Sequence, residues 1–151
     1  MVAPSSLAVF LKHHRSIYLD TSAVIYFVEH HPRYFPVCDE LFREIESGRA
    51  KASTSTLTLL EVLVQPYRLK KDDLVLKFYA LLTTYPYLAW IPMTLNVADQ
   101  AAKLRAEHGL KTPDSIQAAS AVVCGASGFV CNDKIFGKIG AFESFILDDH
   151  C

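Results

Sequence analysis

Four acidic side chains stand at places in this sequence where exposure on a polar surface explains them poorly. Asp20 follows the apolar stretch S-I-Y-L, and Asp133 follows G-F-V-C and Asn132. Glu61 lies inside T-L-T-L-L-E-V-L-V, with apolar neighbours on both sides, and Asp114 follows Thr-Pro at the start of D-S-I-Q-A-A-S-A-V-V. Charged side chains are rarely buried without a partner, so these positions indicate a shared purpose.

Each acid taken singly has a simpler interpretation. Asp20 can cap a following helix, Asp114 can favour a helix N-terminus, and Asn132-Asp133 can be a polar turn. Glu61 has no comparable explanation. Together, however, several carboxylates in one cleft repel one another unless they are protonated or neutralised by a cation. Oxygen ligands without His or Cys select Mg²⁺ or Mn²⁺, and such an ion activates water and holds phosphate oxygens for phosphodiester hydrolysis.

The order of the expected elements brings these acids toward one edge of a sheet. Strands are expected at 17–20, 51–54, 87–91, 128–131 and 144–147, and helices at 22–29, around 37–45, from about 56 to Pro66, at 72–84, at 94–109 and from Thr112. This alternation predicts an α/β fold with a mostly parallel sheet covered on both faces. Ligands of such sheets bind beyond the carboxyl ends of the strands. If the first and fourth strands are neighbours, Asp20 and Asp133 are separated by little more than the strand spacing of about 4.8 Å.

Composition restricts the class of protein. The 151 residues predict one domain over residues 1–151, with a core from about 17 to 147. Fifteen Lys and Arg against 16 Asp and Glu exclude a general polycation, so any nucleic-acid binding is local. The four cysteines form no C-x-x-C pair, which favours reduced thiols over a disulfide framework or a zinc site. Neither a secretion signal nor a membrane span is recognised, and the expected location is the cytoplasm.

Four segments, in order, carry a resemblance to a known family: Y-L-D-T-S-A-V-I-Y at 18–26, S-T-L-T-L-L-E-V at 55–62, H-G-L-K-T-P-D-S-I-Q-A-A-S-A at 108–121 and F-V-C-N-D-K-I-F at 129–136. The chain resembles PIN-domain proteins, and among them the VapC-type toxins of toxin–antitoxin pairs. The resemblance implies a three-layer α/β/α sandwich and an Mg²⁺- or Mn²⁺-dependent endoribonuclease. It also implies an RNA substrate, a small antitoxin partner and a homodimer.

The resemblance assigns a role to each matching residue. Asp20 and Asp114 hold the metal directly, Asp133 holds it directly or through water, and Glu61 ligates it or orients a water. Among the supporting residues, Thr21 and Ser22 fix the loop that presents Asp20, Ser22 by hydrogen bonding, and Asn132 is a supporting or phosphate-contacting residue. The family usually has Thr where this chain has Cys131, which we interpret as a small core residue.

Two other readings stay open at this stage. A non-catalytic PIN-like or receiver-like binding module leaves Glu61 unexplained. An aspartyl-phosphate phosphatase needs a second Asp two residues after the first, where this chain has Ser22.

The aromatic residues from Phe78 to Trp90 are interpreted as core residues in preference to an RNA-stacking platform or an interface. The pairs His13-His14 and His30-His31 are expected to be solvated loop residues.

Overall fold

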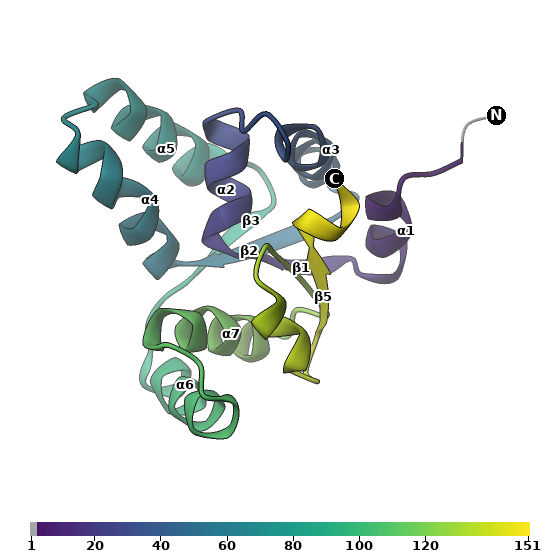
Figure 1. The fold of residues 1–151 in the computed structure, drawn as a ribbon, viewed down its shortest axis with the longest axis vertical. Coiled ribbons are helices and arrows are strands. Elements are labelled where there is room, and N and C mark those ends of the chain that lie inside the picture. The colour runs from purple at the N-terminus through teal and green to yellow at the C-terminus, as the bar shows by residue number, and fades with distance from the viewer. Residues whose placement is uncertain (1–2) are drawn as a thin grey trace.

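The computed structural model describes residues 3–151, across which five parallel strands form one sheet with helices on both faces (Figure 1). The order is β3-β2-β1-β4-β5, and every neighbouring pair is parallel. The strands are β1 (Ser16–Leu19), β2 (Lys51–Ser55), β3 (Leu88–Ile91), β4 (Gly128–Cys131) and β5 (Glu143–Ile146). The predicted α/β/α sandwich is confirmed. The predicted domain extent of 1–151 stays a prediction, and its first two residues lie outside the described part.

The helices divide unequally between the two faces. On one face lie α1 (Ser6–His13), α2 (Thr21–Val28), α3 (Phe35–Glu46), α4 (Thr56–Arg68) and α5 (Asp72–Thr84); on the other lie α6 (Leu95–His108) and α7 (Thr112–Cys124). Two short 3-10 helices, η1 (Lys134–Lys138) and η2 (Leu147–His150), follow β4 and β5. Within the described residues, no helix combines the length and the apolar character needed to cross a membrane.

The inner strands β1 and β4 are buried on both faces, which explains their largely apolar sequences. In β1, Ile17 and Leu19 pack with the five-helix layer, whereas Tyr18 between them packs with α6 and α7. Successive side chains of a strand point to opposite faces, so this short strand contributes to both cores. The strand order reverses between β1 and β4, and a crevice for ligands is expected beyond their carboxyl ends at such a point.

Local signals predicted most helix ends within a residue or two. Thr94 accepts a hydrogen bond from the N–H of Val97 at the start of α6, and Gly109, with φ +67°, ends that helix. Pro66 was expected to end or kink α4. The helix does not end there but continues to Arg68, and Leu69 N–H donates to the carbonyl oxygen of Gln65 across the turn that contains Pro66.

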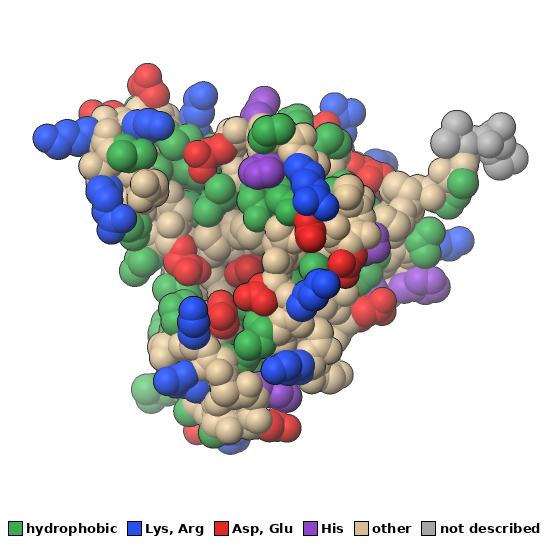
Figure 2. Space-filling view, viewed as in Figure 1, with side chains coloured by type: hydrophobic (Ala, Val, Ile, Leu, Met, Phe, Trp, Pro, Cys, Tyr) green, Lys and Arg blue, Asp and Glu red, His purple; other side chains and the backbone are tan. Residues whose placement is uncertain are grey.

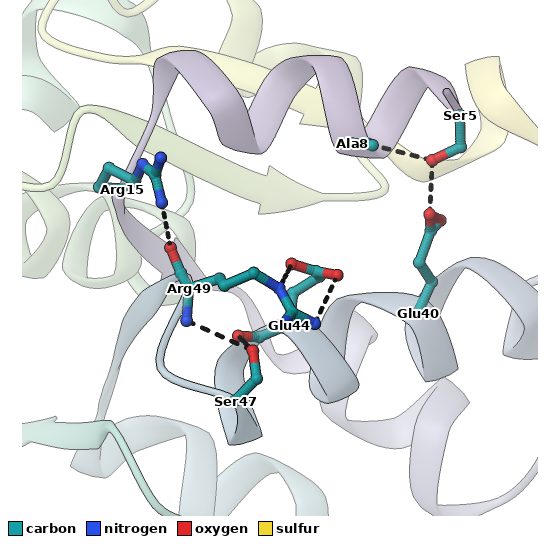
Figure 3. A network of polar contacts seen from close by, with 7 residues as sticks. All are labelled: Ser5, Ala8, Arg15, Glu40, Glu44, Ser47 and Arg49. Carbon is teal, nitrogen blue, oxygen red and sulfur yellow. Dashed lines mark hydrogen bonds and ion pairs between the residues drawn. The ribbon is translucent and has the colours of Figure 1, made fainter. Parts of the chain in front are cut away.

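The segment before β1 forms a helix, α1, that the sequence analysis did not assign. Ser5 caps it by accepting a hydrogen bond from Ala8 N–H at 3.0 Å, and the same hydroxyl donates to Glu40 of α3 at 2.5 Å (Figure 3). Beyond the other end of α1, Arg15 donates to the carbonyl oxygen of Arg49 (3.1 Å). These contacts hold α1 against the layer that contains α3.

One histidine of this region was predicted wrongly. The side chain of His14 is only 12% exposed, and its ring nitrogens hydrogen bond to Ser127 (2.9 Å) and Glu143 (2.7 Å). It also packs against the ring of Phe10. The two hydrogen bonds come from segments more than 100 residues away, so the local sequence carried no sign of them.

Candidate functional site

Asp20 and Asp133 follow neighbouring strands and meet at the same edge of the sheet. Leu19 of β1 pairs with Val130 of β4, and the N–H of Asp20 donates to the carbonyl oxygen of Val130 at 3.0 Å. The two strands are therefore neighbours, which was the condition for Asp20 and Asp133 to lie close together. Asp20 occupies the N-cap position of α2, but its side chain makes no capping hydrogen bond. Helix capping thus does not account for this carboxylate.

Asp133 and Asp114 are presented by the starts of helical turns. Asp133 precedes η1, where its Oδ1 accepts a hydrogen bond from Ile135 N–H at 3.0 Å. Asp114 lies in the first turn of α7, as predicted, although Thr112 is the first residue of that helix and Lys111 takes the N-cap position. Asp133 is exposed, whereas Asp114 is half-buried.

Glu61 comes from α4 and is held by hydrogen bonds from two other elements. Its Oε1 accepts from the hydroxyl of Thr21 at 2.7 Å and from the side-chain amide of Gln117 at 2.9 Å. The hydroxyl of Thr21 thus supports Glu61, and its role in fixing the loop of Asp20 stays a prediction. Gln117 was missed. A polar residue one turn after Asp114, among the small residues of α7, was the available signal.

The four carboxylates influence one another electrostatically. Burial is the main cause that raises the pKa of Asp20 from 3.8 to about 7, and the charges of Glu61, Asp114 and Asp133 raise it further. The pKa of Asp114 is also raised, first by burial and then by Asp133 and Glu61, while Lys111 acts in the opposite sense. Figure 2 shows acidic side chains gathered in the middle of this face, between the two helical layers. The structure therefore brings all four predicted acids into one electrostatic cluster.

The donor set of this cluster fits a hydrated hard cation better than a fully protein-ligated one. Among the described residues, no three His, Cys, Asp or Glu side chains are grouped so that they can hold one ion. Nor does any of the four acids form an ion pair within that part of the chain. Mg²⁺ commonly binds through one or two carboxylates and keeps several waters. Two direct carboxylate ligands with waters fit the arrangement.

The hydroxyl of Ser22 is consistent with such a hydrated ion. It is buried and has no hydrogen-bond partner among residues 3–151, so the predicted hydrogen bond to the Asp20 loop is wrong. A buried hydroxyl without a partner is costly, and a water satisfies it. Because Ser22 lies two residues after Asp20, a water bound to its hydroxyl lies near the four acids.

Asn132 and Cys131 serve the strand end that presents Asp133. The amide of Asn132 donates to the hydroxyl of Tyr26 at 3.1 Å, and its Oδ1 accepts from Asp148 N–H at 2.8 Å. Asn132 thus links the end of β4 to α2 and to η2. Cys131 is fully buried in the core, as predicted, and burial raises the pKa of its thiol to about 12.

The aromatic residues near α5 divide between core and surface. Phe78 is fully buried and Trp90 packs against the same core, which confirms the core interpretation for both. The hydroxyl of Tyr85 donates to the carbonyl oxygen of Phe42 at 2.7 Å. Tyr79 and Tyr87 are 38% and 52% exposed. Tyr79 and Tyr87 are therefore the members of this group that are exposed to solvent.

Comparison with known proteins identifies the family. The family model described as PIN domain matches residues 17–141, and the chain belongs to the PIN domain family. A search of curated protein sequences gives no match.

Solved structures with the same fold include components of three toxin–antitoxin assemblies. VapBC2 from Rickettsia felis, bound to a DNA fragment from its promoter, has a TM-score of 0.67 at 19% identity over 87% of this chain and 98% of that one. A toxin–antitoxin complex from Klebsiella pneumoniae has a TM-score of 0.67 at 20% identity, covering 87% and 97%. DNA-bound VapBC from Salmonella typhimurium has a TM-score of 0.64 at 20% identity, covering 87% and 98%. At these identities the likeness establishes the fold.

Proposed function

We propose that this protein is a metal-dependent endoribonuclease that hydrolyses RNA phosphodiester bonds, and that it acts as the toxin of a toxin–antitoxin pair. The observation that carries the proposal is the cluster of Asp20, Glu61, Asp114 and Asp133. Four different segments deliver these acids to the strand ends where α/β proteins bind ligands. Keeping them ionised together is unfavourable without a cation, because burial first and then the charges of the other three acids raise the pKa of Asp20.

The chain's own residues divide the work of binding and orientation. Asp20 and Asp114 are the proposed direct ligands of Mg²⁺ or Mn²⁺, and Asp133 contributes directly or through water. Glu61, fixed by Thr21 and Gln117, ligates the ion or orients a water. When bound, the ion supplies positive charge for the phosphate oxygens and lowers the pKa of water.

The partners follow from the family and from the assemblies that share the fold. Membership in the PIN domain family supports a nuclease, and the three solved relatives are toxin–antitoxin complexes. We therefore propose a small antitoxin as the partner, with its C-terminal segment against the cluster of Asp20, Glu61, Asp114 and Asp133. A homodimer and a cytoplasmic location are part of the same proposal.

Cleavage of RNA by purified variants tests the proposal. Wild-type protein should cut single-stranded RNA with Mg²⁺ or Mn²⁺ and lose this activity in EDTA. Asp20→Asn and Asp114→Asn should fold and fail to cut. Asp99→Asn is a matched control, because Asp99 is an exposed carboxylate of α6 that pairs with Lys103. This variant should cut RNA as wild type does.

Two results would contradict the proposal. If Asp20→Asn or Asp114→Asn cuts RNA at the wild-type rate, that residue has been given the wrong role. If wild-type protein cuts no RNA with either ion, the inert binding module becomes the better reading.

A further inference from the structure

A buried glutamine connects the acidic cluster to the core. Gln117 lies on α7 with only 1% of its surface exposed, and its side chain is surrounded by polar groups from β1, α2 and α4. Its Nε2 is 2.9 Å from Glu61 Oε1, 3.1 Å from Thr21 Oγ1 and 3.2 Å from Thr58 Oγ1. On the other side, its Oε1 accepts a hydrogen bond from the hydroxyl of Tyr18.

The contacts with Glu61 and Thr21 determine which way the amide of Gln117 faces. A flipped amide would turn its carbonyl oxygen toward the Glu61 carboxylate, which is an acceptor when ionised, and toward the oxygen of Thr21, whose hydroxyl hydrogen is donated to Glu61. At the other end of the amide, the fully buried Tyr18 donates its hydroxyl hydrogen to Gln117 Oε1 and anchors that oxygen. The hydrogen-bond network therefore holds the NH₂ group toward Glu61.

This arrangement treats the two oxygens of Glu61 differently. Oε1 receives one hydrogen bond from Gln117 and a second, at 2.7 Å, from Thr21. Oε2 has no hydrogen-bond partner within residues 3–151. A carboxylate with one oxygen occupied by two donors has the other left for an ion or a water.

We infer that Gln117 is a positioning residue that restricts Glu61 to acting through Oε2, an inference that rests on the proposed metal-dependent function. Gln117 touches neither the ion nor the substrate. It holds Glu61 through Oε1, and its own amide oxygen is anchored by the hydroxyl of Tyr18. Groups that orient a metal-binding or water-orienting carboxylate typically change metal affinity or activity by about 10- to 100-fold when they are removed.

Mn²⁺ affinity measured by calorimetry tests this role without relying on RNA cleavage. Gln117→Met keeps the length of the side chain and removes the hydrogen bonds, so Mn²⁺ should bind about 10- to 100-fold more weakly. Tyr18→Phe keeps the glutamine and removes the hydrogen bond that anchors its amide oxygen, so it should give a smaller loss of affinity. Leu104→Val is the control. Leu104 lies on α6 and is buried in the core that α6 and α7 share, so a smaller side chain there weakens packing without touching the hydrogen bonds of Gln117.

The outcomes separate this inference from the proposed function. Wild-type affinity in Gln117→Met overturns the inference. If Gln117→Met does not fold, wild-type affinity in Tyr18→Phe overturns it, and so does an equal loss in Leu104→Val. Wild-type protein that binds Mn²⁺ but cuts no RNA overturns the proposed reaction and leaves the positioning of Glu61 standing. Wild-type protein that binds no Mn²⁺ overturns both.

Discussion

Replacement of Asp20 by Asn should stabilise the metal-free protein at alkaline pH. The carboxyl of Asp20 has a pKa of about 7 in the folded protein, against an ordinary value of 3.8, chiefly because it is buried. Its folded form therefore holds the proton more tightly than its unfolded form does. Ionisation of this group destabilises the fold as pH rises from about 4 to about 7, and the effect is constant above that range.

The magnitude follows from the same two values. At about 1.4 kcal/mol for each unit of pKa, a rise from 3.8 to about 7 corresponds to about 4 kcal/mol at pH 8. This is an upper limit, because the Asn amide must itself find hydrogen bonds. We expect Asp20→Asn to raise the free energy of unfolding by about 1 to 4 kcal/mol at pH 8, and by less than about 1 kcal/mol at pH 4.

Urea denaturation in EDTA at pH 4 and pH 8 measures both values, with Asp99→Asn as the control. Asp99 is exposed, so its replacement should change stability by no more than about 0.5 kcal/mol at either pH. If Asp20→Asn is no more stable than wild type at pH 8, or gains equally at both pH values, the reasoning from burial and neighbouring charge is refuted.

Two further predictions concern the rest of the molecule. Phe78→Ala should lower the free energy of unfolding by about 3 to 5 kcal/mol, because Phe78 is fully buried, whereas Tyr79→Ala should change it far less. Similar losses for the two variants in urea denaturation would contradict the division of the aromatic residues between core and surface. Cys151 is exposed and should react with a thiol reagent in the native protein. Cys38 and Cys131, whose thiol pKa values burial raises to about 12, should react only after unfolding, and mass spectrometry that finds native Cys131 labelled would contradict this.

The sequence predicted best what depends on pattern and topology. Alternating strands and helices implied parallel strands, which the structure confirms. The sequence placed Asp20 and Asp133 close together only if the first and fourth strands are neighbours, and the β1–β4 pairing meets that condition. Caps such as Thr94 and Gly109 predicted the ends of α6 because their interactions are local.

What could not be predicted depends on residues distant in the chain. The contacts of His14 come from Ser127 and Glu143, and those of Gln117 from three elements that precede it by 56 to 99 residues. No short-range pattern records such separations. Likewise, the sequence placed Ser22 beside Asp20 without revealing that its hydroxyl has no partner in the described part of the chain.

Calorimetric titration of Mn²⁺ into wild-type protein, Asp20→Asn and Asp114→Asn at neutral pH tests most directly the claim that the four acids form a metal site. We predict that wild-type protein binds Mn²⁺, that Asp20→Asn and Asp114→Asn lose this binding, and that Asp99→Asn retains it. Mn²⁺ binding by Asp20→Asn and Asp114→Asn with wild-type affinity would contradict it.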